Sequence, residues 1–173
     1  FLNYLYLGLY KYTFSRMSSP DYKCMLKKSL IEFTIRGNKA GVQYYIDNEF
    51  DVNTQEDGYS LLTIAINYGH DELVDYLIQC GANIYHTLKD GKNLLHVAAI
   101  KGRFQMIPKL LGEDGILLNQ QTDTGKTPLY YACENRNYLA TCALLKAGAN
   151  VDIPDERKVT PLYFSCFRGS LWR

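Results

Sequence analysis

A leucine recurs along the chain at an almost constant interval. The intervals are 33, 34 and 33 residues, and they separate Leu62, Leu95, Leu129 and Leu162. Each copy lies within a similar phrase of eight residues, and the phrases occupy 58–65, 91–98, 125–132 and 158–165. A period in this range predicts stacked supersecondary units, each of which buries its apolar face only against a neighbour.

The repeated unit resembles the ankyrin repeat, which has a glycine turn, a Thr-Pro-Leu-His phrase, two helices with a Leu-Leu pair in the second, and a closing Gly-Ala-Asn. Thr127-Pro128-Leu129 matches the phrase, and 81–83 and 148–150 match the closing motif. The resemblance extends from about residue 20 to residue 173. It implies an all-α repeat fold, namely an ankyrin-repeat solenoid of about four to five helix-turn-helix repeats with β-hairpin-like tips.

The repeat pattern also divides the chain into segments. We expect an N-terminal tail outside the repeats, a divergent first repeat, three further repeats and an incomplete fifth repeat, with boundaries at 1–16, 17–56, 57–89, 90–122, 123–155 and 156–173.

The tail, residues 1–16, is aromatic and apolar but is interrupted by Lys11. Its apolar run is too short to cross a bilayer, so we expect no membrane span. It lacks the basic start and the small-residue cleavage site of a signal peptide. Met17 is an alternative start, in which case the residues before it are a leader or a piece of another sequence.

The first repeat opens with a helix-start pattern. Ser19 is placed to cap a helix whose first residue is Pro20. Apolar residues then recur at helical spacing and are expected to face the core; they are Met25, Leu26, Leu30 and Phe33. Tyr45-Ile46 takes the place of the Leu-Leu pair.

Turns and core positions follow the repeat period. Glycines and aspartates favour turns at 57–58, 90–91 and 123–125. The resemblance to ankyrin repeats implies that three alanines lie where two helices approach closely. It also implies that three apolar pairs form the core between repeats. The alanines are Ala65, Ala98 and Ala132, and the pairs are Leu77-Ile78, Leu110-Leu111 and Leu144-Leu145.

Three departures from the pattern predict local irregularity. Pro108 lies several residues inside the expected second helix of the third repeat, where proline costs about 3 kcal/mol unless the helix starts late or kinks. The same repeat has Glu113-Asp114-Gly115 with one extra residue. Arg136 replaces the glycine that the other repeats place between their helices.

Charge and cysteine content narrow the classes of partner. The 19 Lys and Arg residues and 18 Asp and Glu residues give a net charge of +1, so we expect no nucleic-acid partner. Five cysteines without a Cys-x-x-Cys pair argue against a zinc site and against a complete disulfide framework. The cysteine content indicates a protein of a reducing compartment, so we expect a location in the cytoplasm or the nucleus.

Signals for catalysis are weak. Gly125-Lys126-Thr127 lacks the preceding glycine of a phosphate-binding loop, since position 120 is Gln. The three histidines lack the spacing of a metal site or a catalytic triad. The resemblance implies that His96 forms the structural hydrogen bonds of the histidine in the Thr-Pro-Leu-His phrase. Cys133 and Cys166 are equivalent positions and are interpreted as core residues. We therefore expect no enzyme activity, no cofactor and no metal.

The remaining hypothesis is recognition of a protein or peptide. The resemblance implies a concave surface formed by turn tips and the exposed ends of the first helices. Carried over by position, the candidate partner-binding residues are Tyr59, Asn67, Tyr68, Lys92, Ile100, Lys101, Lys126, Glu134, Asn135, Phe167 and Arg168. This surface would be aromatic and mildly basic, which favours a weakly acidic partner.

Three functions remain open. The first is a non-catalytic interaction scaffold or adaptor. The second is a substrate-receptor subunit of a cullin-type ubiquitin ligase, because residues 127–133 and the Leu-Leu-Lys-Ala-Gly-Ala-Asn that follows resemble ankyrin-and-SOCS-box adaptors. The third is the ankyrin module of a larger enzyme or channel. Fold resemblance alone does not separate them.

Overall fold

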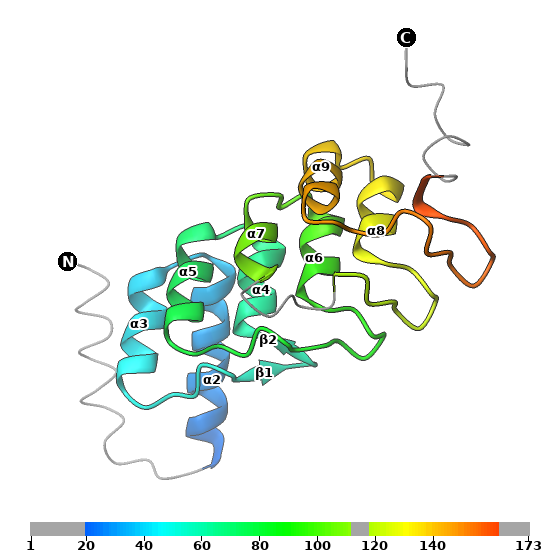
Figure 1. Ribbon diagram of the computed structural model, residues 1–173. Coiled ribbons are helices and arrows are strands. Elements are labelled where there is room, and N and C mark those ends of the chain that lie inside the picture. Colours follow the sequence, from blue (N-terminus) through cyan, green and yellow to red (C-terminus); the bar gives the residue numbers. More distant parts are fainter. Residues whose placement is uncertain (1–19, 112–117, 163–173) are drawn as a thin grey trace.

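The computed structural model describes residues 20–111 and 118–162, and it confirms the expected helical repeat solenoid. Helices follow one another in pairs, with a short hairpin before the third helix (Figure 1). The elements are α2 (Pro20–Ile35), α3 (Lys39–Asp47), β1 (Gln55–Glu56), β2 (Tyr59–Ser60), α4 (Leu61–Tyr68), α5 (Asp71–Gln79), α6 (Leu94–Lys101), α7 (Met106–Leu111), α8 (Pro128–Glu134) and α9 (Tyr138–Lys146).

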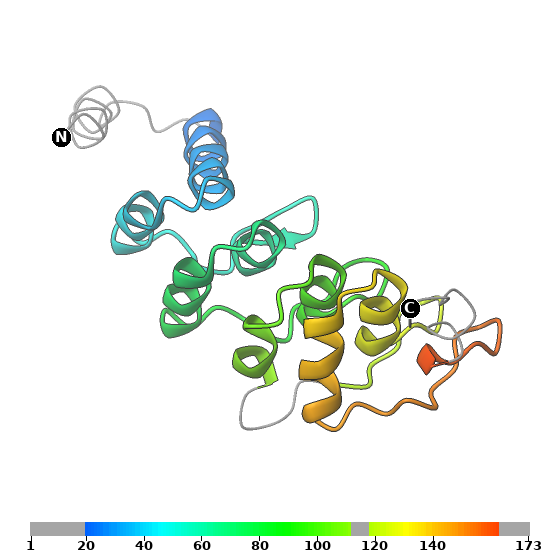
Figure 2. The same ribbon diagram turned by 90° about the horizontal axis from the view of Figure 1, so that it is seen from above.

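The helices form two rows, which Figure 2 shows from above. The first helices of the pairs, α2, α4, α6 and α8, make one row, and α3, α5, α7 and α9 make the other. The main contacts join helices within one pair or in neighbouring pairs, such as α4 with α6 and α6 with α8. The core is therefore a continuous seam between successive repeats, as expected for a solenoid.

One polar residue caps each of three first helices. Ser60, Asn93 and Thr127 hold extended backbone just before α4, α6 and α8, and each side chain accepts a hydrogen bond from the backbone N–H three residues later. These N-caps use a donor that the helix itself leaves unpaired. The repeat period thus reproduces the same helix start three times.

The turns between repeats lie on one side of the stack. Gln55 pairs with Ser60, and Glu56 pairs with Tyr59, in the antiparallel hairpin of β1 and β2. In the next repeat a single bridge joins Thr87 and Asn93. Successive turns are also tied together, because Asp123 N–H donates to the Asp90 carbonyl and Glu156 N–H donates to the Thr124 carbonyl, both at 3.2 Å.

Arg136 shows how the third departure is accommodated. Gly69 and Gly102 end α4 and α6 with φ of 83° and 67°. Arg136 adopts the same left-handed conformation, with φ of 58°. A residue with a Cβ pays for this conformation by about 1–2 kcal/mol, so the turn is kept at a cost in backbone strain.

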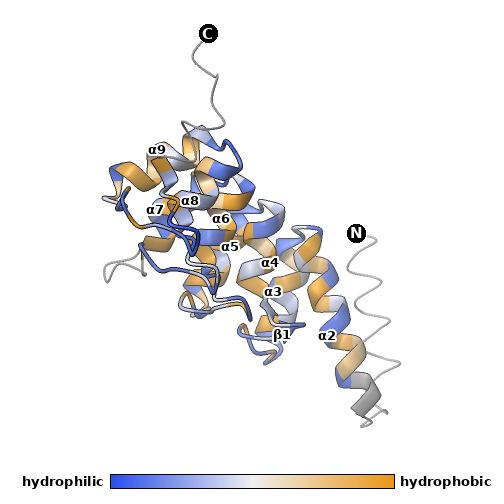
Figure 3. Ribbon diagram, turned by 90° about the vertical axis from the view of Figure 1, so that its right-hand side faces the viewer, coloured by the Kyte–Doolittle hydropathy of each residue, from blue (hydrophilic) through white to orange (hydrophobic). Residues whose placement is uncertain are grey.

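The core residues are largely those expected. The three alanines are fully buried, and so are the first members of the apolar pairs, Leu77, Leu110 and Leu144. Leu145 is 45% exposed, whereas Ile78 and Leu111 pack partly against the core, so its expected core role is wrong. Met25 is also half exposed, in contrast to the buried Leu30. Figure 3 shows apolar segments along the helices and polar segments along the connecting loops.

Pro108 does not interrupt a helix. α7 begins at Met106, so the helix starts late, as one of the two expected accommodations, and Pro108 is its third residue rather than an interior one. The first turn of a helix has no intrahelical partner for its N–H groups, so proline removes no bond there. The Phe104 carbonyl, four residues before Pro108, accepts from Ile107 N–H at 3.3 Å. Glu113-Asp114-Gly115 lies outside the described residues.

The end of the described chain shows an exposed leucine. Leu162 is 59% exposed, whereas Leu62, Leu95 and Leu129 are at most 2% exposed. Phe164, Cys166, Phe167 and Arg168 lie outside the described residues. Within the described segments, no helix is both long enough and apolar enough to span a membrane.

Candidate functional site

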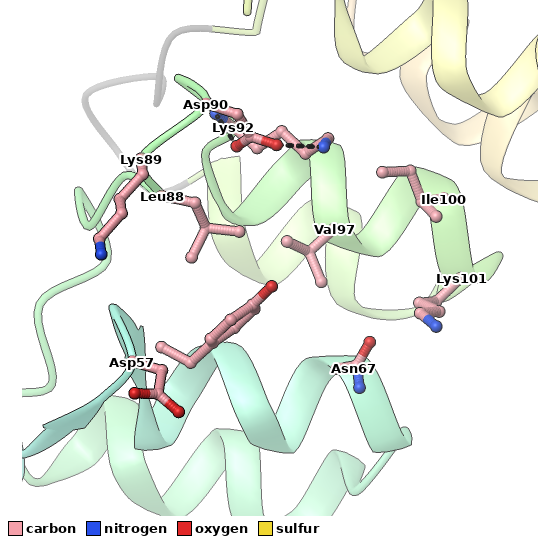
Figure 4. Close-up of a pocket in the computed structure, with 10 residues that line it drawn as sticks. Asp57, Asn67, Leu88, Lys89, Asp90, Lys92, Val97, Ile100 and Lys101 are labelled. Carbon is pink, nitrogen blue, oxygen red and sulfur yellow. Dashed lines mark hydrogen bonds and ion pairs between the residues drawn. The ribbon is translucent and has the colours of Figure 1, made fainter.

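Two hollows lie between the turns and the first-helix row. Hollow A has a volume of about 420 Å³ and is defined by the turn residues and helix ends that line it. These residues are Asp57, Tyr59, Asn67, Leu88, Lys89, Asp90, Lys92, Val97, Ile100 and Lys101. Figure 4 shows that they come from two neighbouring repeats, with Asn67 on one helix and Val97, Ile100 and Lys101 on the next.

Lys92 and Asp90 form an ion pair at the edge of hollow A. Burial opposes the charge of Lys92, but its hydrogen bond to Asp90 and the charge interactions with Asp90 and nearby tyrosines together outweigh burial and raise the pKa of the Lys92 ammonium. Burial likewise opposes the charge of Asp90, and the hydrogen bonds from Lys92 outweigh it and lower the pKa of the Asp90 carboxyl. Both groups are therefore charged at neutral pH, and each offsets the other.

Hollow B has a volume of about 450 Å³ and lies farther along the stack. Its lining residues are Thr124, Lys126, Tyr130, Tyr131, Glu134, Asp155, Glu156 and Arg157. The Lys126 ammonium donates to both carboxylate oxygens of Glu134, at 2.9 and 3.0 Å. A lysine of this hollow is thus paired in the same way as Lys92.

Asp155 is a buried carboxylate in the wall of hollow B. The Tyr130 hydroxyl donates to its Oδ2 at 2.9 Å, and the N–H groups of Arg157 and Val159 donate to its Oδ1 at 2.9 Å. Burial alone would raise the pKa of Asp155, but these hydrogen bonds outweigh it and lower that pKa. Burial, followed by the bond to Asp155, raises the pKa of the Tyr130 hydroxyl.

Tyr131 lies between two lysines. The Lys92 ammonium is 5.5 Å from the centre of the Tyr131 ring, and the Lys126 ammonium is 5.3 Å from it. Lys126 is also 4.9 Å from the centre of the Tyr130 ring. Such distances allow cation–π attraction. Because Lys92 lines hollow A and Tyr131 lines hollow B, these two side chains connect the hollows.

The structure brings together most of the candidate residues. Hollow A gathers Tyr59, Asn67, Lys92, Ile100 and Lys101, and hollow B gathers Lys126 and Glu134. Tyr68 lies outside both linings, is 49% exposed and stacks on His70 with ring centres 6.3 Å apart. Asn135 is exposed at the end of α8, and its side chain donates to the Tyr131 carbonyl at 2.9 Å.

Two lining tyrosines are not among the sequence candidates. Tyr130 and Tyr131 lie in the recurring phrase, which predicts a helix and assigns them no binding role. Tyr130 occupies the position of His96, and that equivalence was the available signal for a polar group directed at the next turn. The expected excess of positive charge is reduced, because Lys92 and Lys126 each have a carboxylate partner.

His96 serves the structure rather than chemistry. It is fully buried, its Nδ1 accepts from Asn93 N–H at 3.1 Å, and its Nε2 donates to the Lys126 carbonyl at 3.1 Å. Burial, reinforced by the nearby charge of Lys92, lowers the pKa of His96 to about 4. The expectation of structural hydrogen bonds is confirmed.

Metal-ligating and disulfide-forming groups are sparse along the described chain. Residues 20–111 and 118–162 hold no cluster of three or more His, Cys, Asp or Glu side chains suited to a metal ion. The cysteines described there are free, and Cys133 packs partly buried against the core. The lining of the two hollows offers ion pairs, hydrogen bonds and aromatic faces, which are the means of noncovalent recognition.

Comparison with known proteins agrees with this architecture. The family model "Ankyrin repeats (3 copies)" matches residues 30–122 and 72–155. The target of rapamycin complex 2 subunit AVO2 of Saccharomyces cerevisiae is 30% identical over 155 residues, covering 85% of this chain and 36% of that protein. The putative ankyrin repeat protein FPV034 of Fowlpox virus is 34% identical over 124 residues, covering 71% and 28%.

Some similar proteins are enzymes by name. The palmitoyltransferase AKR1 of Lachancea kluyveri is 30% identical over 155 residues, which cover 86% of this chain and 21% of that protein. The chain thus spans only about a third or less of the length of these relatives. Ankyrin repeats are typically non-catalytic and generally mediate protein–protein interaction. From the repeat architecture and the family match, the chain belongs to the ankyrin-repeat family.

Proposed function

We propose that this chain is a non-catalytic protein-interaction module, a scaffold or adaptor that binds a partner protein or peptide on the concave surface containing hollows A and B. The observation that carries the proposal is hollow A, where five candidate residues from two repeats line one depression. Ankyrin repeats generally bind other proteins, and this supports the same conclusion.

The lining of hollow A has the chemistry of a binding surface. Tyr59 is 46% exposed, and the partly buried Leu88 and Ile100 add apolar surface beside it. Lys89 and Lys101 are exposed at the edge, where they form no ion pair among the described residues. An aromatic and apolar centre with a polar rim is typical of protein interfaces.

A second candidate function is supported by the relatives. The palmitoyltransferase AKR1 and the Legionella pneumophila phosphocholine transferase AnkX are similar to this chain, which covers 21% and 16% of their lengths. In this alternative, the chain is the ankyrin module of a larger enzyme or channel and supplies binding while another segment supplies activity. No comparable observation favours the ubiquitin-ligase hypothesis. Location in the cytoplasm or nucleus stays part of the proposal.

The proposal is tested with the double variant Tyr59→Ala/Lys101→Ala. Both residues line hollow A and are exposed, so their removal should weaken binding by about 2 kcal/mol, or about thirtyfold, if they belong to a hot spot. The melting temperature should stay nearly unchanged, because neither side chain is in the core. The measurement is titration calorimetry with a partner first captured by the parent chain and then purified.

The matched control is Tyr138→Ala/Lys146→Ala on α9. It removes the same residue types from exposed positions in the other row of helices. The control should bind as the parent does. Equal affinity of the parent and the hollow A variant for the purified partner would contradict binding at hollow A.

A further inference from the structure

The two hollows differ in the sign of their charge. Hollow A is lined by three lysines and two aspartates, so its formal charge is +1. After the pair of Lys92 with Asp90 is set aside, Lys89 and Lys101 remain against Asp57. All three of these side chains belong to exposed residues. An acidic side chain entering hollow A would therefore meet two lysines without a partner among the described residues.

Hollow B has the opposite balance. It is lined by three acidic residues and two basic residues, so its formal charge is −1. After the pair of Lys126 with Glu134 is set aside, Asp155 and Glu156 remain against Arg157. Asp155 stays ionised because its hydrogen bonds stabilise the carboxylate. The exposed Glu156 forms no ion pair among the described residues.

Lys126 shows which ligand chemistry hollow B accepts. Its ammonium lies 4.9 and 5.3 Å from two tyrosine ring centres and 2.9 Å from a carboxylate oxygen. Aromatic faces and carboxylates together stabilise a cation. Because Lys126 already occupies Glu134, a lysine or arginine from a partner would meet the exposed Glu156 and the rim of the tyrosine rings.

We propose that the concave surface binds an extended segment of a partner protein whose charge reverses along its length, with an acidic side chain in hollow A and a basic side chain in hollow B. This inference rests on the proposed function and refines it. It replaces the weakly acidic partner that the sequence favours, because the carboxylates of Asp90 and Glu134 offset two of the expected lysines.

The spacing of the two charges follows from the repeat geometry. Hollow A lies between the second and third predicted repeats, and hollow B between the fourth and fifth. Packed helices lie about 10 Å apart, so the hollows are separated by about 20 Å. An extended segment covers about 3.3 Å per residue. The acidic and basic residues of the partner are therefore about six residues apart.

A library of random peptides displayed on phage tests the inference with the whole chain as bait. The selected peptides should carry an acidic and a basic residue about six positions apart, in one constant order along the peptide. Selected peptides are then synthesised and their affinities are measured by fluorescence anisotropy. Raising the salt concentration should weaken them, since exposed charges are screened.

Charge-reversed variants assign each end of the peptide to a hollow. Lys89→Glu/Lys101→Glu leaves hollow A with one lysine and four acidic residues and should lower the affinity of the parent-selected peptides by at least about tenfold. A new selection on this variant should replace the acidic residue by a basic one. In hollow B, Glu134→Gln/Glu156→Gln should abolish the selection for a basic residue and leave the selection for an acidic residue unchanged.

The matched control is Lys23→Glu/Lys28→Glu, which makes the same charge change at two exposed positions of α2 that line neither hollow. It should leave affinity within about twofold of the parent. Peptides of a single charge sign that still respond to Tyr59→Ala/Lys101→Ala would overturn the inference and leave the proposed function intact. No enriched peptides, or peptides insensitive to every variant in the hollows, would contradict both.

Discussion

The third and fourth repeats solve the same structural problem with different side chains. In the third repeat, His96 donates from its ring to the Lys126 carbonyl in the next turn. In the fourth, Tyr130 donates from its hydroxyl to the Asp155 side chain in the next turn. Both residues lie three positions after the N-cap residue of their helix and are at most 3% exposed. The position requires a donor that reaches the following repeat rather than a particular residue.

The two repeats also differ in the turn before the second helix. Gly102 precedes α7, whereas Arg136 precedes α9 in the same left-handed conformation. The turn is therefore relaxed in the third repeat and strained in the fourth.

The largest effect that we expect from this comparison is a loss of stability at low pH caused by His96, which has no counterpart in the fourth repeat. Its pKa is about 4 in the folded chain against 6.5 for an unperturbed histidine, so the unfolded chain binds the proton more tightly. Stability from this group is complete above about pH 6.5 and falls as the pH drops toward 4, by up to about 3 kcal/mol. Urea unfolding of the parent and of His96→Gln over this range isolates the contribution. Identical pH profiles would contradict a neutral buried histidine.

The second comparison concerns the donor in the fourth repeat. Tyr130→Phe keeps the ring but removes the hydrogen bond to Asp155, and it should lower the free energy of unfolding by about 1–2 kcal/mol. Tyr131→Phe is the matched control, since no hydrogen bond of its hydroxyl is found among the described residues, and it should change stability little. Thermal unfolding followed by circular dichroism measures both. An equal effect of the two variants would remove the assigned role of Tyr130.

The third comparison concerns the turn. Arg136→Gly should stabilise the chain by about 0.5–1 kcal/mol, because relief of left-handed strain exceeds the added entropy of the unfolded glycine. Gly102→Ala should do the reverse, since its Cβ would lie 3.0 Å from the Asn137 side chain at a φ of 67°. Chemical unfolding gives both values. Destabilisation by Arg136→Gly would show that the arginine side chain contributes more than the strain costs.

The smallest expected effect is that of Pro108→Ala. Pro108 lies in the first turn of α7, where a backbone N–H would have no intrahelical acceptor. The change to alanine should therefore alter the free energy of unfolding by less than about 0.5 kcal/mol. Urea unfolding measures this change. A larger gain or loss of stability would show that Pro108 contributes through the packing of its ring rather than through its backbone.

The repeat period predicted the fold because it records an interaction that recurs. Leu62, Leu95 and Leu129 are buried in equivalent places, and Ser60, Asn93 and Thr127 cap equivalent helices. Pattern matching could not place Leu145 correctly, because its exposure depends on which neighbour covers that face rather than on its own repeat.

The site was less predictable than the fold. Position alone brought Tyr59, Lys92 and Lys101 to one hollow, since turn tips and helix ends recur with the repeat. The pairing of Lys126 with Glu134 joins residues eight positions apart across a turn and a helix, and no repeat pattern encodes it. The charge of each hollow is therefore a property of the folded side chains.

Each helix pair packs mainly against its immediate neighbours, so elastic bending of the molecule takes place at the junctions between pairs. A small rotation at one junction need not disturb the packing of a distant one, and rotations at successive junctions add along the stack. Bending energy is thus divided among the junctions, so a modest change in curvature costs little at each. A surface that extends over several junctions can open or close around what it holds through this shared compliance.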